Sequence, residues 1–277
     1  MDADRMIRSP ASPRKWMVPV DDTALSVTDT RSSGPPILYL NGSYASQRSW
    51  SRVVAELGPE WRHITYDERA RGRSKRSMDY SFEGCLCDVD SVVAATGVDR
   101  PVLVGWSYGA ALAVHWADRN PDRVTGVVSV DGAVPFGLTG QANRERIRHA
   151  FRAMRWCLPL ARPFGLAASM SAAQHAEVNI EINEVCAAIE PVLERLSCPV
   201  RYVLGSGSSL GGAAEEMQKM RASLAPVLRR KSNLRVSAQV DSNHTQILRK
   251  DFRAVAAAVR EVAALGSRGS LGRWQSG

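Results

Sequence analysis

The strongest chemical signal in the chain is a serine flanked by two glycines. Residues 105–109 read Gly-Trp-Ser-Tyr-Gly, a G-x-S-x-G pattern with Ser107 at its centre. The apolar run 101–106 before it is typical of a buried strand, and the segment 108–119 after it is typical of a helix. A sharp turn from strand to helix exposes the serine hydroxyl and directs backbone N–H groups at developing negative charge. The pattern therefore predicts Ser107 as a nucleophile, the alternative being an ordinary surface serine.

A serine hydroxyl needs a base that accepts its proton. The chain has five histidines, which are His63, His115, His149, His175 and His244. Among them, His244 follows the last strand expected from the sequence, at 234–240, and stands in a polar loop. Because the order serine then histidine suits a strand-turn-helix nucleophile, we expect His244 to be the base.

These motifs, in this order, resemble the α/β-hydrolase superfamily, and the resemblance covers about residues 15–265. Asn41, Gly42 and Ser43 stand where that family usually has His-Gly-x after its third strand. In the family, the backbone N–H of the third residue forms half of an oxyanion hole. The resemblance therefore implies an oxyanion hole made by the N–H groups of Ser43 and Tyr108. Asparagine replaces the usual histidine here, but the backbone carries this role.

Two further segments resemble the same family. Residues 66–74 match its D-x-R-G-x-G-x-S loop, except that Ala70 replaces the first glycine. That loop is structural in the family. Residues 241–248 resemble the segment that carries the family's histidine, which agrees with His244 as the base.

The acid of the implied triad is not at its usual place. The family commonly carries it after the seventh strand in a G-x-x-D pattern, where this chain has Ser208. Some members, including certain dehalogenases and lactonases, carry it after the sixth strand, where this chain has Asp131. We expect Asp131 to hold the imidazole tautomer and to stabilise the imidazolium. Asp241, close to His244 in sequence, and a dyad without any acid are the alternatives.

Short β-rich runs alternate with helical patterns, which predicts βαβ units and a mostly parallel sheet. Strands are expected at 15–20, 24–30, 36–40, 63–67, 101–106, 124–132, 200–205 and 234–240. Helices are expected at 81–96, 108–119, 211–229 and 247–264, and an amphipathic segment lies near 48–57. The first two strands should form a hairpin through Asp21 and Asp22. The expected fold class is α/β: an α/β-hydrolase fold with a mostly parallel eight-stranded sheet, flanking helices and a helical cap insertion.

Residues 134–197 interrupt the alternation, since they contain helical patterns and no convincing strand. We expect them to form a helical cap, inserted in an α/β-hydrolase core of residues 15–133 and 198–265. Residues 1–14 and 266–277 are expected to be flexible ends. The residues expected to line a substrate pocket are Gly42, Tyr44, Trp106 and Trp156, with core packing as the alternative for the tryptophans.

The composition is that of an ordinary globular protein. Apolar residues make up 44% and charged residues 23% of the 277 residues. No apolar run has the length of a membrane span, and the N-terminus lacks the apolar stretch of a secretory signal. The five cysteines form no CxxC pair, which argues against a disulfide framework or a zinc site. We therefore expect a cytoplasmic protein with no metal, no organic cofactor and no membrane partner.

The net charge of +8 would suit an acidic partner such as a nucleic acid. The densest basic run consists of Arg69, Arg71, Arg73, Lys75 and Arg76. No aromatic residues interleave this run, and no nucleic-acid-binding motif accompanies it. We interpret the run as a solvated loop and expect a small-molecule substrate, not a nucleic acid, as the partner. No oligomeric state is predicted.

Together these residues predict a serine hydrolase that cleaves an ester, thioester or lactone of a small to medium hydrophobic substrate through an acyl-enzyme on Ser107. C–C bond hydrolysis, cofactor-free perhydrolysis and acyl transfer use the same triad and stay as alternatives. Epoxide hydrolysis and dehalogenation are less expected, because family members with those activities have Asp in place of Ser107. A non-catalytic ligand-binding protein is the alternative from another class, favoured by the missing acid after the seventh strand.

Overall fold

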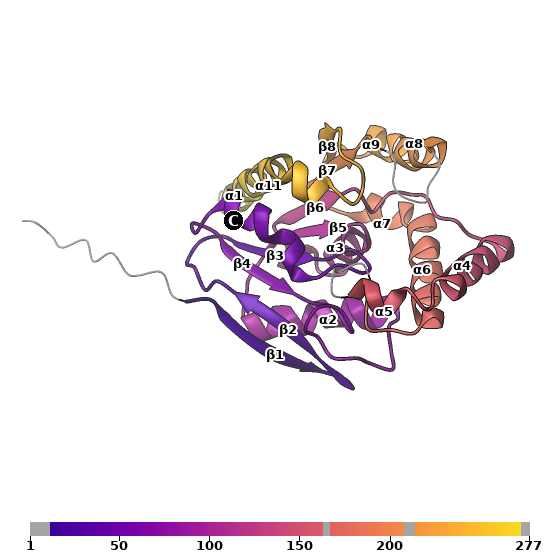
Figure 1. Ribbon diagram of the computed structural model, residues 1–277. Helices are drawn as coiled ribbons and strands as arrows, with labels where there is room; N and C mark the ends of the chain where they lie inside the picture. Colours follow the sequence, from indigo (N-terminus) through magenta and orange to yellow (C-terminus); the bar gives the residue numbers. More distant parts are fainter. Residues whose placement is uncertain (1–11, 163–166, 208–213, 273–277) are drawn as a thin grey trace, which may run out of the picture.

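One sheet of eight strands forms the centre of the molecule (Figure 1). The computed structural model describes residues 12–162, 167–207 and 214–272. The strands are β1 (Arg14–Val20), β2 (Thr23–Asp29), β3 (Pro36–Leu40), β4 (Arg62–Tyr66), β5 (Val102–Trp106), β6 (Gly126–Val130), β7 (Val200–Gly205) and β8 (Leu234–Val240). Their spatial order is β1-β2-β4-β3-β5-β6-β7-β8.

Strand β1 pairs antiparallel with β2, and β2 pairs antiparallel with β4, whereas the other neighbouring pairs are parallel. Asp21 and Asp22 form the turn of the β1–β2 hairpin, as expected. The predicted mostly parallel, eight-stranded sheet with flanking helices is therefore confirmed.

Helices cover both faces of the sheet, which is why the central strands are apolar on both sides. The helices are η1 (Gln47–Trp50), α1 (Ser51–Leu57), α2 (Phe82–Thr96), α3 (Tyr108–Arg119), η2 (Pro121–Arg123), α4 (Gln141–Ala153), α5 (Leu158–Ala161), α6 (Ala172–Ala187), α7 (Glu190–Arg195), α8 (Ala214–Ala222), α9 (Ala225–Arg230), α10 (Ile247–Lys250) and α11 (Phe252–Gly272). In β3, Ile37 and Tyr39 pack in the cluster that contains α1 and α11. Leu38 and Leu40 alternate to the opposite face, in the cluster that contains α2 and α3.

Two helices expected from the sequence are each divided in the structure. The segment 211–229 contains α8 and α9, with Pro226 in the first turn of α9. Proline lacks a backbone N–H and therefore starts a helix more readily than it continues one. The segment 247–264 contains α10 and α11, which meet at Asp251.

The ends of the chain differ from their expected bounds where they are described. Helix α11 continues to Gly272, so the tail expected to begin at residue 266 is helical up to that point. Arg14, expected in the flexible N-terminal segment, already belongs to β1. The rest of both predictions, residues 1–11 and 273–277, lies outside the described residues.

The segment between β6 and β7 folds into helices α4 to α7, without a strand among its described residues. Figure 1 shows α4, α5 and α6 lying together to one side of the sheet. Ile147 and Phe151 of α4 pack with Ala176 and Ile180 of α6 in an apolar cluster separate from the two that flank the sheet. These helices therefore have a small core of their own.

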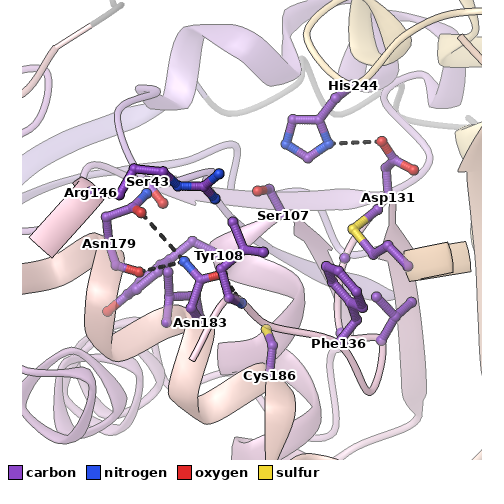
Figure 2. A pocket seen from close by; sticks show the side chains of 16 residues that line it. Ser43, Ser107, Tyr108, Asp131, Phe136, Arg146, Asn179, Asn183, Cys186 and His244 are labelled. Carbon is purple, nitrogen blue, oxygen red and sulfur yellow. Dashed lines mark hydrogen bonds and ion pairs between the residues drawn. The ribbon is translucent and has the colours of Figure 1, made fainter. Parts of the chain in front are cut away.

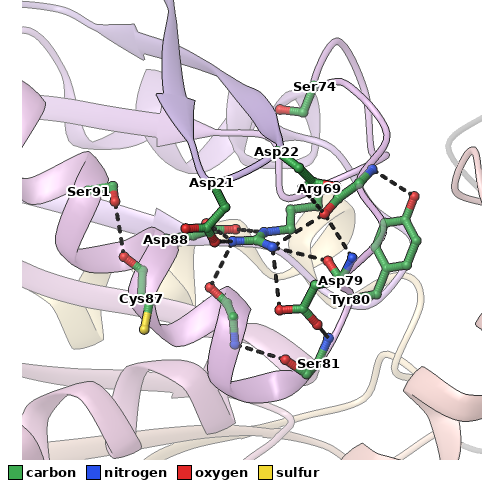
Figure 3. A network of polar contacts seen from close by, with 12 residues as sticks. Asp21, Asp22, Arg69, Ser74, Asp79, Tyr80, Ser81, Cys87, Asp88 and Ser91 are labelled. Atoms are coloured by element: carbon green, nitrogen blue, oxygen red, sulfur yellow. Dashed lines mark hydrogen bonds and ion pairs between the residues drawn. The ribbon is translucent and has the colours of Figure 1, made fainter.

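The basic run interpreted as a solvated loop is partly buried, so that interpretation is wrong for Arg69 and Arg71. The fully buried Arg69 side chain forms ion pairs with Asp88 of α2 at 2.7 Å, with Asp21 at 2.6 Å and with Asp79 at 3.6 Å (Figure 3). A buried guanidinium is tolerated only when carboxylates neutralise it, and these carboxylates come from distant segments. The remaining members of the run are exposed: Arg73, Lys75 and Arg76.

Removing Arg69 should destabilise the fold. We expect Arg69→Met to lower the free energy of unfolding by about 3 kcal/mol, because Asp88 would stay buried without its cation. Urea denaturation of the variant and of an Arg76→Met control, which changes an exposed arginine of the same loop, measures the difference. Equal destabilisation in both variants would contradict a structural role for the Arg69 network.

Candidate active site

Ser107 lies in a strained turn between β5 and α3. Its backbone has φ 55° and ψ −113°, a region that residues with a side chain rarely adopt. The flanking glycines permit this turn through close packing. A Cβ on Gly105 would lie 2.2 Å from Gly109 O, and a Cβ on Gly109 would lie 2.2 Å from Leu40 O. The turn thus requires glycine at both positions and presents the serine at the carboxyl end of β5.

His244 and Asp131 are in direct contact. The Nδ1 atom of His244 lies 2.7 Å from Asp131 Oδ2, although 113 residues separate the two in sequence. Asp131 follows β6 at φ 46°, its carboxylate is fully buried, and Oδ1 accepts a hydrogen bond from the Gly205 N–H at 3.2 Å. Asp241, the other candidate acid, is exposed. Of the two candidate acids, Asp131 is therefore the one whose carboxylate contacts the imidazole.

Arg221 of α8 is a neighbour of this pair that no motif in the sequence predicts. Its Nε lies 3.8 Å from Asp131 Oδ1, and its guanidinium donates to Ser206 O at 3.3 Å and to Gly207 O at 3.2 Å. These carbonyls belong to the segment after β7, where the family usually carries its acid. Arg221 places a positive charge beside the buried carboxylate and ties that segment to it.

Two backbone N–H groups face the same site. Ser43 and Tyr108 both line the cavity with Ser107, and in the described part of the chain neither of their N–H groups donates a hydrogen bond. Tyr108 is the first residue of α3, where backbone N–H groups have no partner within the helix. Both N–H groups are thus free to bind an anionic oxygen.

Arg71 fixes the loop that carries Ser43. Its Nε donates to Ser43 O at 2.8 Å, and its Nη1 donates to Arg69 O at 2.9 Å. The guanidinium also lies over the Tyr108 ring, 5.8 Å from the centroid. One buried arginine therefore contacts both residues whose N–H groups face the site.

Asn41, at the place of the family's usual histidine, anchors the start of this loop. Its side chain donates to Tyr66 O at 2.6 Å and to Glu68 Oε2 at 2.8 Å, and it accepts from Trp50 Nε1 at 2.8 Å. Its N–H donates to Glu68 Oε1 at 2.8 Å. Burial raises the pKa of Glu68 to about 7, against the opposing effects of the Arg71 charge and of these hydrogen bonds.

A cavity of about 340 Å³ opens beside Ser107 (Figure 2). Figure 2 shows Ser107 on the side of the imidazole away from Asp131. The lining residues are Ser43, Ser107, Tyr108, Asp131, Gly132, Ala133, Val134, Phe136, Leu138, Arg146, Asn179, Ile182, Asn183, Cys186, Met220 and His244. The structure thus brings together the five predicted residues Ser107, His244, Asp131, Ser43 and Tyr108 on one cavity.

The four residues expected to line the pocket are not among those that line this cavity, so those expectations need correction. The Trp106 ring packs on His244, with 5.6 Å between the ring centroids, and leaves no room for a side chain at Gly42. Tyr44 turns away from Ser43 and stacks on His175 in the cluster of α4 and α6. Trp156 is 74% exposed, because it stands beyond the packed face of the inserted helices.

The other histidines have structural surroundings or lie at the surface. His63 contacts Tyr39 Oη and Gly58 O, each at 2.9 Å, and burial lowers its pKa. Burial likewise lowers the pKa of His115 on α3 and of His175 on α6. His149 is exposed. Of the five, His244 is the one that lines the cavity with Ser107.

Within the described ranges, no group of three or more His, Cys, Asp or Glu residues is arranged to hold a metal ion. The five cysteines are all free thiols. Among the same residues, no helix has both the length and the apolar character needed to span a bilayer.

Comparisons with known proteins agree on the fold. A family model described as the alpha/beta hydrolase fold matches residues 35–155. A haloalkane dehalogenase of Mesorhizobium japonicum is 30% identical over 146 residues, which are 52% of this chain and 47% of the relative. Epoxide hydrolase B of Mycobacterium tuberculosis is 32% identical over 123 residues, which are 41% of this chain and 34% of the relative. The chain thus spans less than half the length of these curated relatives.

Solved structures resemble nearly the whole chain. An esterase from Exiguobacterium antarcticum superimposes with a TM-score of 0.69 at 16% identity, covering 89% of this chain and 98% of that one. The thioesterase domain of the curacin biosynthetic pathway gives a TM-score of 0.67 at 17% identity, covering 90% and 99%. At these identities the likeness concerns the fold alone.

The raised pKa of Glu68 predicts a pH-dependent stability. A carboxyl whose ordinary pKa of 4.5 is raised to about 7 in the folded chain stabilises the fold while it is protonated, and that contribution is lost as pH rises from about 4.5 to about 7. We therefore expect the stability of the wild type relative to Glu68→Gln to fall across this window, by up to about 3 kcal/mol. Denaturant unfolding of both proteins at several pH values measures the difference, and a difference that is constant with pH would contradict the raised pKa.

Proposed function

The chain belongs to the α/β-hydrolase superfamily, and from this premise we propose that it is a serine hydrolase acting on esters, thioesters or lactones through an acyl-enzyme on Ser107. The observation that carries the proposal is the convergence of three groups on one cavity: the hydroxyl of Ser107, the imidazole of His244 and the buried carboxylate of Asp131. A nucleophile, a base and a group that orients the base are the components that acyl transfer needs.

The proposed mechanism follows from the hydrogen bond between His244 and Asp131. Nδ1–H donates to the carboxylate, which leaves Nε2 as the acceptor for the Ser107 proton. Ser107 Oγ attacks the carbonyl carbon, and the N–H groups of Ser43 and Tyr108 stabilise the oxyanion. The imidazolium then protonates the leaving group. Water, activated by His244 in the same way, releases the acid from Ser107.

The cavity wall supports a substrate of moderate size with an apolar portion. Val134, Phe136, Leu138, Ile182 and Met220 supply apolar surface beside the nucleophile. Helix α6 and the segment before α4 contribute part of this wall. We propose that the inserted helices α4 to α6 act as the cap expected from the sequence, closing the cavity over the carboxyl ends of β5 and β6.

The missing carboxylate after β7 is the feature that favours the alternative, a ligand-binding protein without turnover. The contact of Asp131 with His244 weakens that alternative, because an orienting carboxylate is available from β6. The strained backbone of Ser107 also favours a catalytic role, because strained backbone conformations are found mostly at active sites and binding sites.

Labelling with a fluorophosphonate probe tests the proposal. We expect the wild type to be labelled at Ser107, as read from the modified peptide by mass spectrometry, and Ser107→Ala to remain unlabelled. His244→Ala should slow labelling by about a thousandfold or more, and Asp131→Asn by about a hundredfold or more, because the imidazole loses its acceptor or its orientation. Asp241→Asn is the matched control, since Asp241 is exposed, and should label at the wild-type rate.

Each outcome has a definite meaning. A folded wild type, verified by circular dichroism, that takes up no probe would overturn the serine hydrolase proposal. Normal labelling of Asp131→Asn together with slow labelling of Asp241→Asn would keep the hydrolase and overturn the assignment of the acid.

A further inference from the structure

One arginine of the inserted helices projects into the cavity. Arg146 of α4 is among the lining residues, and Figure 2 shows its guanidinium extended toward the side of Ser107. Arg146 is exposed and is not part of the buried core. Apart from the Asp131–His244 pair, it is the one ionisable side chain of Asp, Glu, His, Lys or Arg type among the described lining residues.

The neighbouring arginines of the same helix show why this orientation matters. Arg144 pairs with Glu184, and Arg148 pairs with Glu177 at 2.8 Å, both on α6. Residues four apart share a face of a helix, whereas a residue midway between them points away. Arg146 therefore lies on a different face of α4 from the two arginines that pair with α6, and no carboxylate in the described ranges pairs with it.

The one carboxylate that lines the cavity among the described residues is not available to pair with Arg146. The carboxylate of Asp131 already accepts from His244 and Gly205 and lies beside Arg221. Closure of a substrate over Arg146 would remove water from the guanidinium, which is costly unless an anion replaces that water. A guanidinium presents a planar fork of donors that matches a carboxylate.

The other walls limit the kind of anion. On the side of Arg146, Asn179 and Asn183 add polar surface, whereas Phe136 and Leu138 belong to the apolar wall. Asn183 is already engaged, because its Oδ1 accepts from the Leu138 N–H at 2.8 Å and its Nδ2 donates to Asn179 O at 2.7 Å. A single available cation beside apolar surface suits one negative charge, as on a carboxylate, better than a phosphate dianion.

We propose that Arg146 binds a carboxylate of the substrate, so that the enzyme selects esters that carry an acidic group. This inference rests on the proposed serine hydrolase function, because it assigns the substrate class of the same cavity. Arg146 is a specificity-determining residue in this scheme and takes no part in proton transfer.

Paired esters test the inference. The para-nitrophenyl monoester of glutaric acid, which carries a free carboxylate on the acyl side, is compared with the para-nitrophenyl ester of monomethyl glutarate. A second pair places the carboxylate on the leaving group: para-acetoxybenzoate and its methyl ester. We expect the wild type to have the higher kcat/KM for the acidic member of at least one pair, and the pair concerned identifies the side on which the carboxylate lies.

The variants isolate the guanidinium. Arg146→Met should lower the acidic-to-neutral ratio of kcat/KM by about tenfold or more, as expected for the loss of a hydrogen bond to a charged group. Arg146→Lys should retain part of the ratio, because the charge stays while the fork is lost. Arg152→Met is the matched control, since Arg152 is an exposed arginine of the same helix that does not line the cavity, and it should keep the wild-type ratio.

A binding measurement separates this inference from the proposed function. Calorimetric titration of Ser107→Ala with monomethyl glutarate should show binding that weakens by about tenfold or more when Arg146→Met is added. Equal ratios in the wild type and Arg146→Met, in a protein that hydrolyses the neutral esters, would overturn the role of Arg146 alone. Failure of the wild type to hydrolyse any ester or to take up the fluorophosphonate would overturn the hydrolase, whereas the titration would still report on Arg146.

Discussion

The buried carboxylate of Asp131 is the group on which the arrangement of the site depends. An isolated carboxylate in the interior is costly, so its environment must supply hydrogen bonds and positive charge. Here these come from His244 after β8, from the Gly205 N–H at the end of β7 and from Arg221 of α8. The Asp131 carboxylate thus contacts three segments of the chain near the carboxyl ends of β5 and β6. Its hydrogen bond with His244 holds the imidazole in one orientation.

A second buried charge system positions the opposite side of the cavity. Arg69 is neutralised by Asp21 in the β1–β2 hairpin and by Asp88 of α2. Arg71, two residues further on, holds the carbonyls of Ser43 and Arg69. The loop that carries a proposed oxyanion donor is therefore connected through two arginines to the edge of the sheet. A loop interpreted from sequence as solvated is a structural support of the site.

In the inserted helices, ion pairs between α4 and α6 accompany an arginine proposed to bind the substrate. Ion pairs of Arg144 and Arg148 with α6 help to orient α4, and Arg146, on another face of that helix, lines the cavity. Surface ion pairs contribute little stability one by one, so their more important effect here is orientation. Catalytic groups would then come from the sheet, and the choice of substrate would come from the insertion.

The sheet, the turn at Ser107 and the segment of His244 can all be predicted from the sequence. Apolar runs of strand length and the two glycines at 105 and 109 act through local backbone geometry and alternation, which can be read without a partner. Contacts between distant residues, in contrast, become evident only in the folded chain. The choice between Asp131 and Asp241 as the partner of His244, the support from Arg221 and the burial of Arg69 all depend on residues far apart in the chain. Trp156 is expected in a pocket from its residue type alone, yet it is exposed. Burial and ion pairing depend on distances in space, which neither spacing nor residue type along the chain specifies.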